Sequence, residues 1–203
     1  MTLQIIGIPQ SNFVRAVRMV AEEKNIAYEL IPAAPHSDDI RMMSPTGKVP
    51  GMRHRDLQIS ESQAIARYID NTFDGPSLIP TDPNKAAKVE QWVSIAATDI
   101  DQLLMRNYVV EYVFHKDDDG NVVRRKIDRA VKRFPTMFEM IGNAVADGYF
   151  GTNAFSMADC FLTPILNATN MWPEGKERIQ ATDPVREYFS RMSQRESFKN
   201  TAA

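Results

Sequence analysis

The 203-residue chain is poor in the residues that usually hold disulfides or metals: it has one cysteine, Cys160, and three histidines, His36, His54 and His115. A single cysteine excludes a disulfide within the chain and a Cys-x-x-Cys redox site. The histidines are far apart and lack the paired spacing of metal ligands, so we expect no structural zinc and no metal cofactor. We expect Cys160 itself to be a buried core thiol without a catalytic role.

Long apolar runs and a basic excess are also missing. No apolar run reaches the roughly 18 residues that a membrane span requires, and the first residues lack the pattern of a signal peptide. The formal net charge is -2, whereas nucleic-acid binders usually carry a strong basic excess. We therefore expect a cytoplasmic protein that binds neither membranes nor nucleic acids.

The first part of the chain, from residue 2 to about residue 73, alternates strand and helix signals. Short apolar runs end at glycine or proline, and helical periodicity fills the stretches between them. The expected order is β-α-β-(α)-β-β-α, with a right-handed βαβ unit followed by an antiparallel hairpin. The strands are expected at 3–6, 27–31 and in a hairpin over 51–60 that turns at 53–56, and the helices at 11–24 and from 61 to 73.

The second part is expected to be helical throughout. Residues 74–83 include three prolines, which prevent a helix from continuing across them. We therefore divide the chain into a first domain at 1–75, a linker at 76–83 and an all-helical domain at 84–203. Long helices are expected at about 84–115 and 122–147, and further helices from about Ser156 and from Asp183.

Three local features indicate one binding site. Ser11 lies where the first strand turns into the first helix, and a helix N-terminus favours an anion such as a thiolate. In Lys48-Val49-Pro50, a cis bond before the proline would turn the Val49 backbone towards an extended peptide ligand. Glu61-Ser62 at a helix start is suited to hold the carboxylate and the ammonium group of an amino acid. Taken singly, each has an ordinary alternative: a plain N-cap, a loop proline and a capping pair.

Taken together, these motifs resemble the cytosolic glutathione transferases. The similar segments are Gly7-Ile8-Pro9-Gln10-Ser11 and the stretch from Glu22 to Glu29. They continue with Gly47-Lys48-Val49-Pro50, Glu61-Ser62-Gln63-Ala64-Ile65, and Ser156-Met157-Ala158-Asp159 with its Ser-x-x-Asp capping pattern. They follow in order along the whole chain. The resemblance implies a thioredoxin-like α/β N-terminal domain (βαβαββα) and an all-α C-terminal domain.

The resemblance also implies roles for single residues. In serine-type members the hydroxyl at the position of Ser11 activates the thiolate of glutathione, which is the co-substrate. Asn12 remains an alternative thiol donor, whereas the missing tyrosine and cysteine near Ser11 disfavour the tyrosine- and cysteine-type enzymes. The implied glutathione-binding positions are His36, Ser37, Lys48, Val49, Pro50, Glu61 and Ser62.

The second substrate is expected to be an apolar electrophile that lies against the helical domain. Its candidate contacts are Arg106, Tyr108, Tyr112, Phe114 and, with the same alternative of plain helix packing, Trp172. The resemblance implies a homodimer, in which Asp99 or Asp101 could reach the partner's glutathione. The predicted activity is conjugation of glutathione to electrophiles. The alternatives are a glutathione-dependent peroxidase or dehalogenase, and a non-catalytic or regulatory glutathione-binding protein of the same fold.

Overall fold

The computed structural model describes residues 2–202, which form two compact units. The first unit contains residues 2–83 together with residues 193–202, and the second contains residues 84–192. The last residues of the chain, expected in the helical domain, thus group with the first unit. None of the helices in residues 2–202 is long and apolar enough to cross a membrane.

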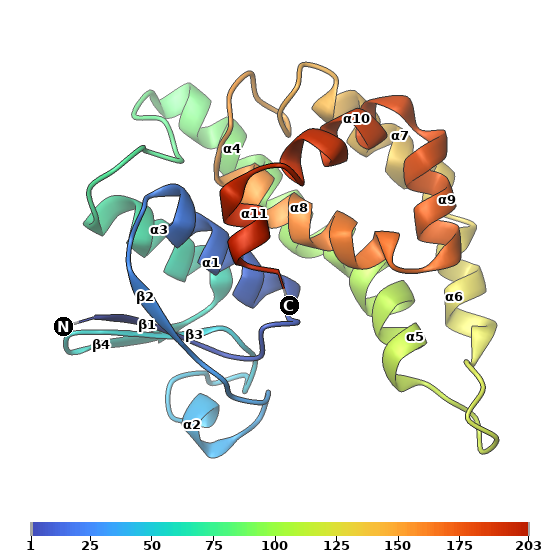
Figure 1. The fold of residues 1–203 in the computed structure, drawn as a ribbon, viewed down its shortest axis with the longest axis horizontal. Helices are drawn as coiled ribbons and strands as arrows, with labels where there is room; N and C mark the ends of the chain where they lie inside the picture. The colour runs from blue at the N-terminus through green and yellow to red at the C-terminus, as the bar shows by residue number, and fades with distance from the viewer. Residues whose placement is uncertain (1, 203) are drawn as a thin grey trace. The chain divides into compact units, whose positions relative to one another are not determined.

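The first unit is built on a four-stranded mixed sheet (Figure 1). The strands β1 (Leu3–Ile6), β2 (Tyr28–Ile31), β3 (Gly51–His54) and β4 (Leu57–Ser60) lie in the order β2-β1-β3-β4. β1 pairs with β2 in parallel, and the pairs β1–β3 and β3–β4 are antiparallel. The predicted βαβ unit and hairpin are therefore confirmed.

The hairpin turn is shorter than expected. The residues Arg53 and His54, predicted to lie in the turn, belong to β3, and Arg53 pairs with Gln58. The turn is left to Arg55 and Asp56, and Arg55 takes a φ of 54°. A glycine would adopt this left-handed conformation without strain. Because the turn contains no glycine, its two-residue length is not apparent from the sequence.

Four helices accompany the sheet: α1 (Asn12–Glu23), α2 (Asp38–Arg41), α3 (Ser62–Thr72) and α11 (Glu196–Asn200). α1 and α3 pack against each other, and α11 packs against α1. α1 is buried along most of its length because Val14, Val17 and Val20 are fully covered. The order βαβαββα predicted for this part of the chain is confirmed, and α11 is an element that the sequence analysis missed.

The second unit begins with one continuous helical rod that changes its hydrogen-bond pattern twice. α4 (Pro83–Ile95) passes into the wider π-helical segment η1 (Ala96–Val109) and then into α5 (Val110–Phe114). The amide of Val110 bonds the carbonyl of Met105, five residues before it. The predicted helix at about 84–115 is therefore present, although its π-helical middle was not foreseen. Such segments are rare in proteins.

The prediction of a second long helix at about 122–147 is wrong in one respect, because the structure has two helices there. α6 (Arg124–Val131) and α7 (Phe134–Val145) are separated by Lys132 and Arg133. Pro135 has no N–H to bond the carbonyl four residues earlier, and its ring crowds that turn. The helix α8 (Met157–Asn170) starts at the predicted position, as does α10 (Asp183–Met192), while α9 (Pro173–Ala181) was not expected.

The start of α8 is held by a network of buried hydrogen bonds. Asp159, which is fully buried, accepts hydrogen bonds from the amides of Phe150 (2.9 Å) and Ser156 (2.8 Å) and from the hydroxyl of Tyr188 (2.9 Å). The Ser156 hydroxyl also contacts it at 3.3 Å. The predicted capping box is therefore present, and it ties α8 to α10 and to the segment before it.

Candidate functional site

The candidate glutathione site is set up by one edge of the sheet. The register places Ile6 opposite Gly51 and beside Ile31, and it places Gly51 opposite Ser60. β1, β2 and β4 therefore end at the same edge, and β3 begins there. The segments 7–11, 32–43, 48–50 and 61–62 all leave the sheet from this edge, so the predicted glutathione-binding positions and Ser11 are brought to one side of the first unit.

Ser11 is the N-cap of α1. Its hydroxyl oxygen accepts a hydrogen bond from the amide of Val14 at 3.4 Å, which is a long contact. Within residues 2–202 the hydroxyl proton of Ser11 has no acceptor, so it remains available to a ligand. The neighbouring Asn12 is buried and is engaged inside the protein. Ser11 is half-buried, so it is the more accessible of the two candidate thiol donors.

Two arginines that the sequence analysis did not single out hold α1 in place. Arg15 and Arg18 are buried and donate to the C-terminal segment: Arg15 to the carbonyl of Phe198 (3.0 Å), Arg18 to those of Thr201 (3.2 Å) and Asn200 (3.1 Å). Desolvation, together with the charge of Arg18, lowers the pKa of Arg15 to about 10. By helical periodicity both lie away from the face of α1 that carries Val17 and Val20, so no pattern in the sequence indicates that they are buried.

Gly7 brings the turn before α1 close to the segment around Val49. A Cβ on Gly7 would lie 2.6 Å from the Val14 side chain and 3.0 Å from that of Val49, so only glycine allows this approach. The Val49–Pro50 peptide bond is cis, as expected. Among the residues that the structure describes, neither the N–H nor the C=O of Val49 has a hydrogen-bond partner. A main-chain edge is thus left open beside the start of α1.

The start of α3 is a second open helix N-terminus. Glu61 is the N-cap residue with φ 72° and ψ 112°, and its carboxylate caps no backbone amide. A positive φ costs a non-glycine residue roughly 1 kcal/mol or more, and such strain collects at functional sites. Glu61 is exposed and Ser62 is 9% exposed. The strained backbone therefore presents a carboxylate and the free amides of a helix start to the same side.

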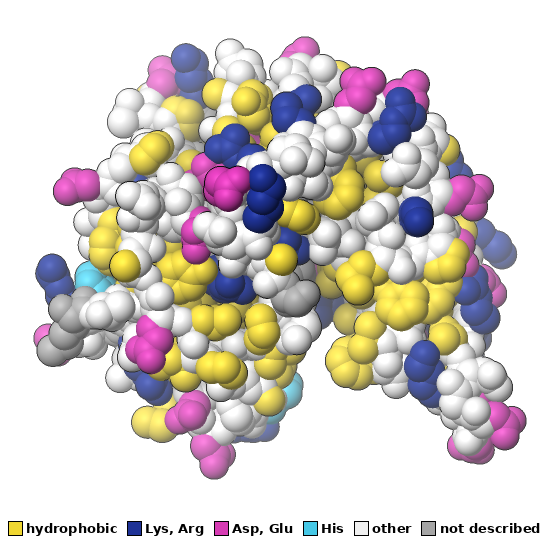
Figure 2. Space-filling view, in the orientation of Figure 1, with side chains coloured by type: hydrophobic (Ala, Val, Ile, Leu, Met, Phe, Trp, Pro, Cys, Tyr) yellow, Lys and Arg dark blue, Asp and Glu magenta, His cyan; other side chains and the backbone are white. Residues whose placement is uncertain are grey.

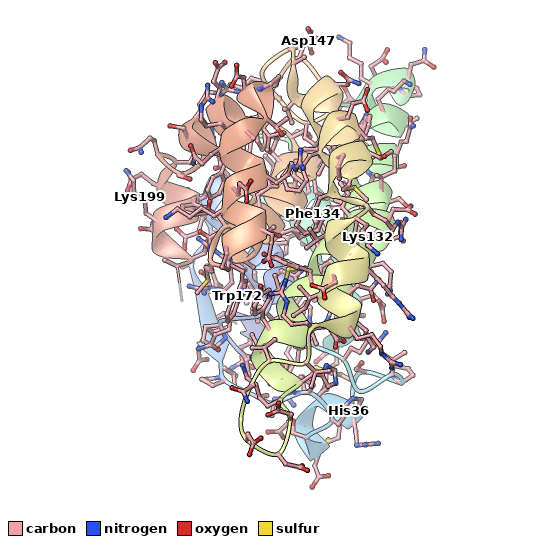
Figure 3. All side chains as sticks on the ribbon, turned by 90° about the vertical axis from the view of Figure 1, so that its right-hand side faces the viewer. His36, Lys132, Phe134, Asp147, Trp172 and Lys199 are labelled. Atoms are coloured by element: carbon pink, nitrogen blue, oxygen red, sulfur yellow. The ribbon has the colours of Figure 1, made fainter. Side chains whose placement is uncertain are left out.

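The segment around α2 brings three further predicted positions to this edge. The amide of His36 bonds the carbonyl of Gly47 at 2.7 Å, and the exposed ring of His36 lies against Gly47. Figure 3 labels His36 beside α2. Ser37 precedes α2, and its buried hydroxyl oxygen has no partner within residues 2–202. Lys48 is exposed, and its amide bonds the hydroxyl of Ser44 at 3.1 Å.

The candidate electrophile contacts in the second unit differ in their accessibility. The side chains of Tyr108 and Tyr112 are buried, and both hydroxyls donate to Oε2 of Glu174, at 3.0 Å and 2.6 Å. Phe114 is 72% exposed. Arg106 forms a two-pronged ion pair with Asp101 at 2.8 Å and 3.1 Å. The structure therefore does not bring these four side chains into one accessible cluster.

Glu174 is the centre of a polar cluster that the sequence analysis missed. Desolvation alone would raise its pKa, but hydrogen bonds from Tyr112 and Arg124 outweigh that effect and lower the pKa to about 2. Desolvation and the bond to Glu174 raise the pKa of Tyr112 to about 12. The Trp172 ring stacks on Tyr112 with centroids 4.4 Å apart. All these residues thus have partners within the second unit.

Cys160 is fully buried in α8, as predicted. Exposed apolar side chains occur in both units, as Figure 2 shows, and among the large ones are Met42, Phe114 and Met171. The thiol of Cys160 is thus inaccessible, while Phe114 offers an apolar surface to a ligand.

Comparison with known proteins matches both units to one family. Residues 5–77 match the model of the glutathione S-transferase N-terminal domain, and residues 125–191 match that of the glutathione S-transferase C-terminal domain. The two matches include the candidate glutathione-binding segments and the capping box at the start of α8.

Individual known proteins are similar to this chain over most of its length, each at low sequence identity. A stringent starvation protein A homolog of Histophilus somni is 27% identical over 90% of this chain and 81% of its own. A glutathione S-transferase of Hyoscyamus muticus is 25% identical over 82% of each chain. The crystal structure of poplar glutathione transferase F1 has the same fold, with a TM-score of 0.89 at 22% identity over 99% of this chain and 96% of the other. The chain belongs to the glutathione S-transferase family.

Proposed function

We propose that this protein is a serine-type glutathione transferase that joins the thiolate of glutathione to electrophilic small molecules. The observation that carries the proposal is the free hydroxyl proton of Ser11 at the N-terminus of α1. The partial positive charge of a helix N-terminus favours an anion, and a hydroxyl hydrogen bond to a thiolate stabilises it further. Both effects lower the pKa of a bound thiol from its ordinary value of about 8.5.

The chemical step is a substitution at the electrophile. The thiol proton leaves to solvent when glutathione binds, and the thiolate sulfur attacks the electrophilic carbon. A carbon–sulfur bond forms while the bond to the leaving group breaks, and the leaving group departs with its electron pair. Ser11 donates a hydrogen bond to the sulfur before the attack and needs no general base. Holding the two reactants side by side supplies the remaining rate acceleration.

The other open groups at this edge of the sheet suit the rest of the tripeptide. The free N–H and C=O of Val49 pair with the backbone of the cysteinyl residue, as an added strand would, and Pro50 shapes this segment. Glu61 and Ser62 hold the γ-glutamyl end. His36, Ser37 and Lys48 contact the glycine carboxylate, for which Ser37 offers an unpartnered hydroxyl. No metal takes part.

The second substrate is an apolar electrophile, whose identity we leave open. On the helical unit, the exposed ring of Phe114 is its first contact. Arg106, Tyr108 and Tyr112, which the sequence also suggested, are less suited to this role, because both tyrosines are buried and Arg106 is paired with Asp101. We further propose that the enzyme works in the cytoplasm as a homodimer in detoxification.

A second candidate function has a specific observation in its favour. Relatives 24% to 28% identical to this chain are named stringent starvation protein A homologs, not transferases. A regulatory glutathione-binding protein without conjugating activity is therefore the alternative. The hydroxyl proton of Ser11 supports the enzyme, because conjugation needs a donor that stabilises the thiolate.

A ligand-dependent melting experiment separates the two parts of the proposal. A ligand at 100 times its Kd stabilises a fold by about 2.7 kcal/mol, so millimolar glutathione is expected to raise the Tm. A Tm that stays unchanged contradicts glutathione binding altogether. A raised Tm without turnover of a chloronitrobenzene electrophile supports the regulatory alternative instead.

A further inference from the structure

A small basic cavity lies in the second unit where the end of α5 meets the start of α6. The chain leaves α5 at Phe114 and enters α6 at Arg124, and the segment between them folds back on itself (Figure 1). The cavity has a volume of about 190 Å³. It is lined by one acidic, one apolar and four basic residues: Glu111, Val123, His115, Lys116, Arg125 and Lys126. The cavity is therefore basic in a chain whose net charge is -2.

The acidic residue of the cavity, Glu111, is already paired. Its side chain is buried, its Oε1 accepts a hydrogen bond from Lys126 at 2.8 Å, and its Oε2 lies 2.7 Å from Nδ1 of His115. Lys116 and Arg125 are exposed, and their side chains form no ion pair or hydrogen bond with any residue of the described chain, 2–202. The cavity therefore keeps two permanent cations without a counter-charge.

The start of α6 adds to this positive charge. Helix N-termini carry a partial positive charge and are usually stabilised by acidic residues or by a capping side chain. α6 has no acidic residue in its first turn, and its N-cap Val123 offers no capping group. Arg124, Arg125 and Lys126 occupy this turn instead, and among the residues that the structure describes their amides have no hydrogen-bond partner. Such a helix start is unfavourable by itself and is stabilised when an anion binds beside it.

The segment between α5 and α6 is held in place by its own hydrogen bonds. The amide of Val123 bonds the carbonyl of His115 at 3.0 Å. Oδ1 of Asp117 accepts hydrogen bonds from the amides of Asp119 (3.0 Å) and Asn121 (2.8 Å). The three aspartates at 117–119 do not line the cavity. The wall of the cavity is thus fixed before a ligand binds, which lowers the entropic cost of binding.

We propose that this cavity binds the phosphate group of a small phosphate monoester. The two negative charges of such a group match the two unpaired cations, Lys116 and Arg125, and the guanidinium of Arg125 offers two parallel donors to phosphate oxygens. The free amides at the start of α6 supply further donors. Val123 offers an apolar contact to a short organic substituent. The site consists of residues of the second unit alone and does not depend on the proposed glutathione chemistry of the first unit.

Other anions fit the cavity less well. A carboxylate, a sulfonate or a phosphate diester carries a single negative charge, so it would leave one of the two cations unpaired. The phosphates of a nucleic acid backbone are diesters and belong to this weaker class. The charge of the cavity and its small volume therefore favour a phosphate monoester of low molecular mass.

The experiment follows phenyl phosphate by ³¹P NMR as protein is added. It is done near pH 8, where the phosphate is doubly ionised because its second pKa is about 6, and in millimolar glutathione, which competes for the candidate glutathione site. Wild type should bind with a Kd of about 1 mM or lower, and Lys116→Gln/Arg125→Gln at least about tenfold more weakly. The matched control, Arg129→Gln/Lys132→Gln, removes the same charge at exposed residues that do not line the cavity, and it should bind within about twofold of wild type.

Two competitors and a melting experiment complete the test. Benzenesulfonate has the same ring with one charge and dimethyl phosphate is a diester, so each should displace phenyl phosphate only at concentrations at least about tenfold above those of unlabelled phosphate monoester. Without ligand, Lys116→Gln/Arg125→Gln should melt no lower than wild type, because cations at a helix start are unfavourable. The proposal is overturned if wild type does not bind phenyl phosphate, if the two double variants weaken binding equally, or if either competitor binds as tightly as the monoester. None of these outcomes depends on transferase activity.

Discussion

The helices α8 and α1 both begin at a serine N-cap, but the two serines differ in whether their hydrogen-bonding groups have partners. At α8, the Ser156 hydroxyl and the Asp159 carboxylate satisfy each other and their neighbours, and both residues are buried. At α1, Ser11 accepts one long hydrogen bond and keeps its hydroxyl proton free, and at α3 the Glu61 carboxylate caps nothing. A closed helix start contributes stability, because its polar groups have partners before any ligand arrives. An open helix start leaves its backbone amides free to bind a ligand, and we therefore place the activation of glutathione at the start of α1.

The largest expected effect is at the closed helix start. Asp159→Ala removes the acceptor of three buried donors, and breaking such a buried network costs about 3–5 kcal/mol. We expect a loss of this size in the free energy of unfolding measured with urea. Asp128→Ala, which removes an exposed carboxylate paired with Arg124, should change it by less than about 1 kcal/mol. Equal losses in the two variants would refute the contrast.

The next prediction distinguishes the role of Ser11 from that of Ser156. Ser11→Ala should lower the turnover of glutathione conjugation at least about tenfold, with glutathione binding retained, because it removes the donor to the thiolate. Ser156→Ala should instead lower the free energy of unfolding by roughly 1–2 kcal/mol and leave turnover per folded molecule unchanged. Steady-state kinetics and urea unfolding of both variants measure this. Normal turnover of Ser11→Ala would move the thiol donor to another residue, such as Asn12.

A smaller effect concerns backbone strain. Glu61→Gly relieves a φ of 72° and Arg55→Gly relieves a φ of 54°, so neither should lower the free energy of unfolding by more than about 1 kcal/mol. Only Glu61→Gly should raise the KM for glutathione, because only Glu61 lies at the open edge. An equal KM in the two variants would remove Glu61 from the site.

The last effect is the pH dependence of the Glu174 cluster. The pKa of Glu174 lies at about 2, below its ordinary value of 4.5, so the ionised carboxylate stabilises the fold. That contribution is complete above pH 4.5 and is lost as the pH falls towards 2. The stability difference between wild type and Glu174→Gln in urea should therefore shrink over this range. A difference that does not depend on pH contradicts the assigned network.

The sequence predicted those parts of the molecule that local chemistry specifies. The N-cap Ser11, the proline at position 50 and the pattern from Ser156 to Asp159 each impose a local geometry, and each was recognised. The π-helical middle of the long helix was missed because no residue type is specific to it. The hairpin turn was predicted two residues too long, at 53–56, because it lacks the glycine that would mark its position. Contacts distant in sequence, such as Arg15 with Phe198 and Tyr112 with Glu174, form only in the folded chain.

The break between α6 and α7 was also missed in the sequence. Pro135 is visible in the sequence, and the helical periodicity around it is strong enough to hide its effect. Around this break, Arg125, Arg129, Lys132 and Arg133 are exposed cations, which an overall net charge of -2 conceals. The net charge of the whole chain therefore does not predict the charge of an individual surface.

The central claim is that the open start of α1 ionises the thiol of bound glutathione through Ser11. It is tested most directly by titrating the ultraviolet absorbance of the thiolate in the complex of the protein with glutathione, for wild type and Ser11→Ala. We predict that the bound thiol ionises at least one pH unit below free glutathione in wild type and moves back towards the free value in Ser11→Ala. A wild-type complex whose thiol titrates at the same pH as free glutathione would contradict the account.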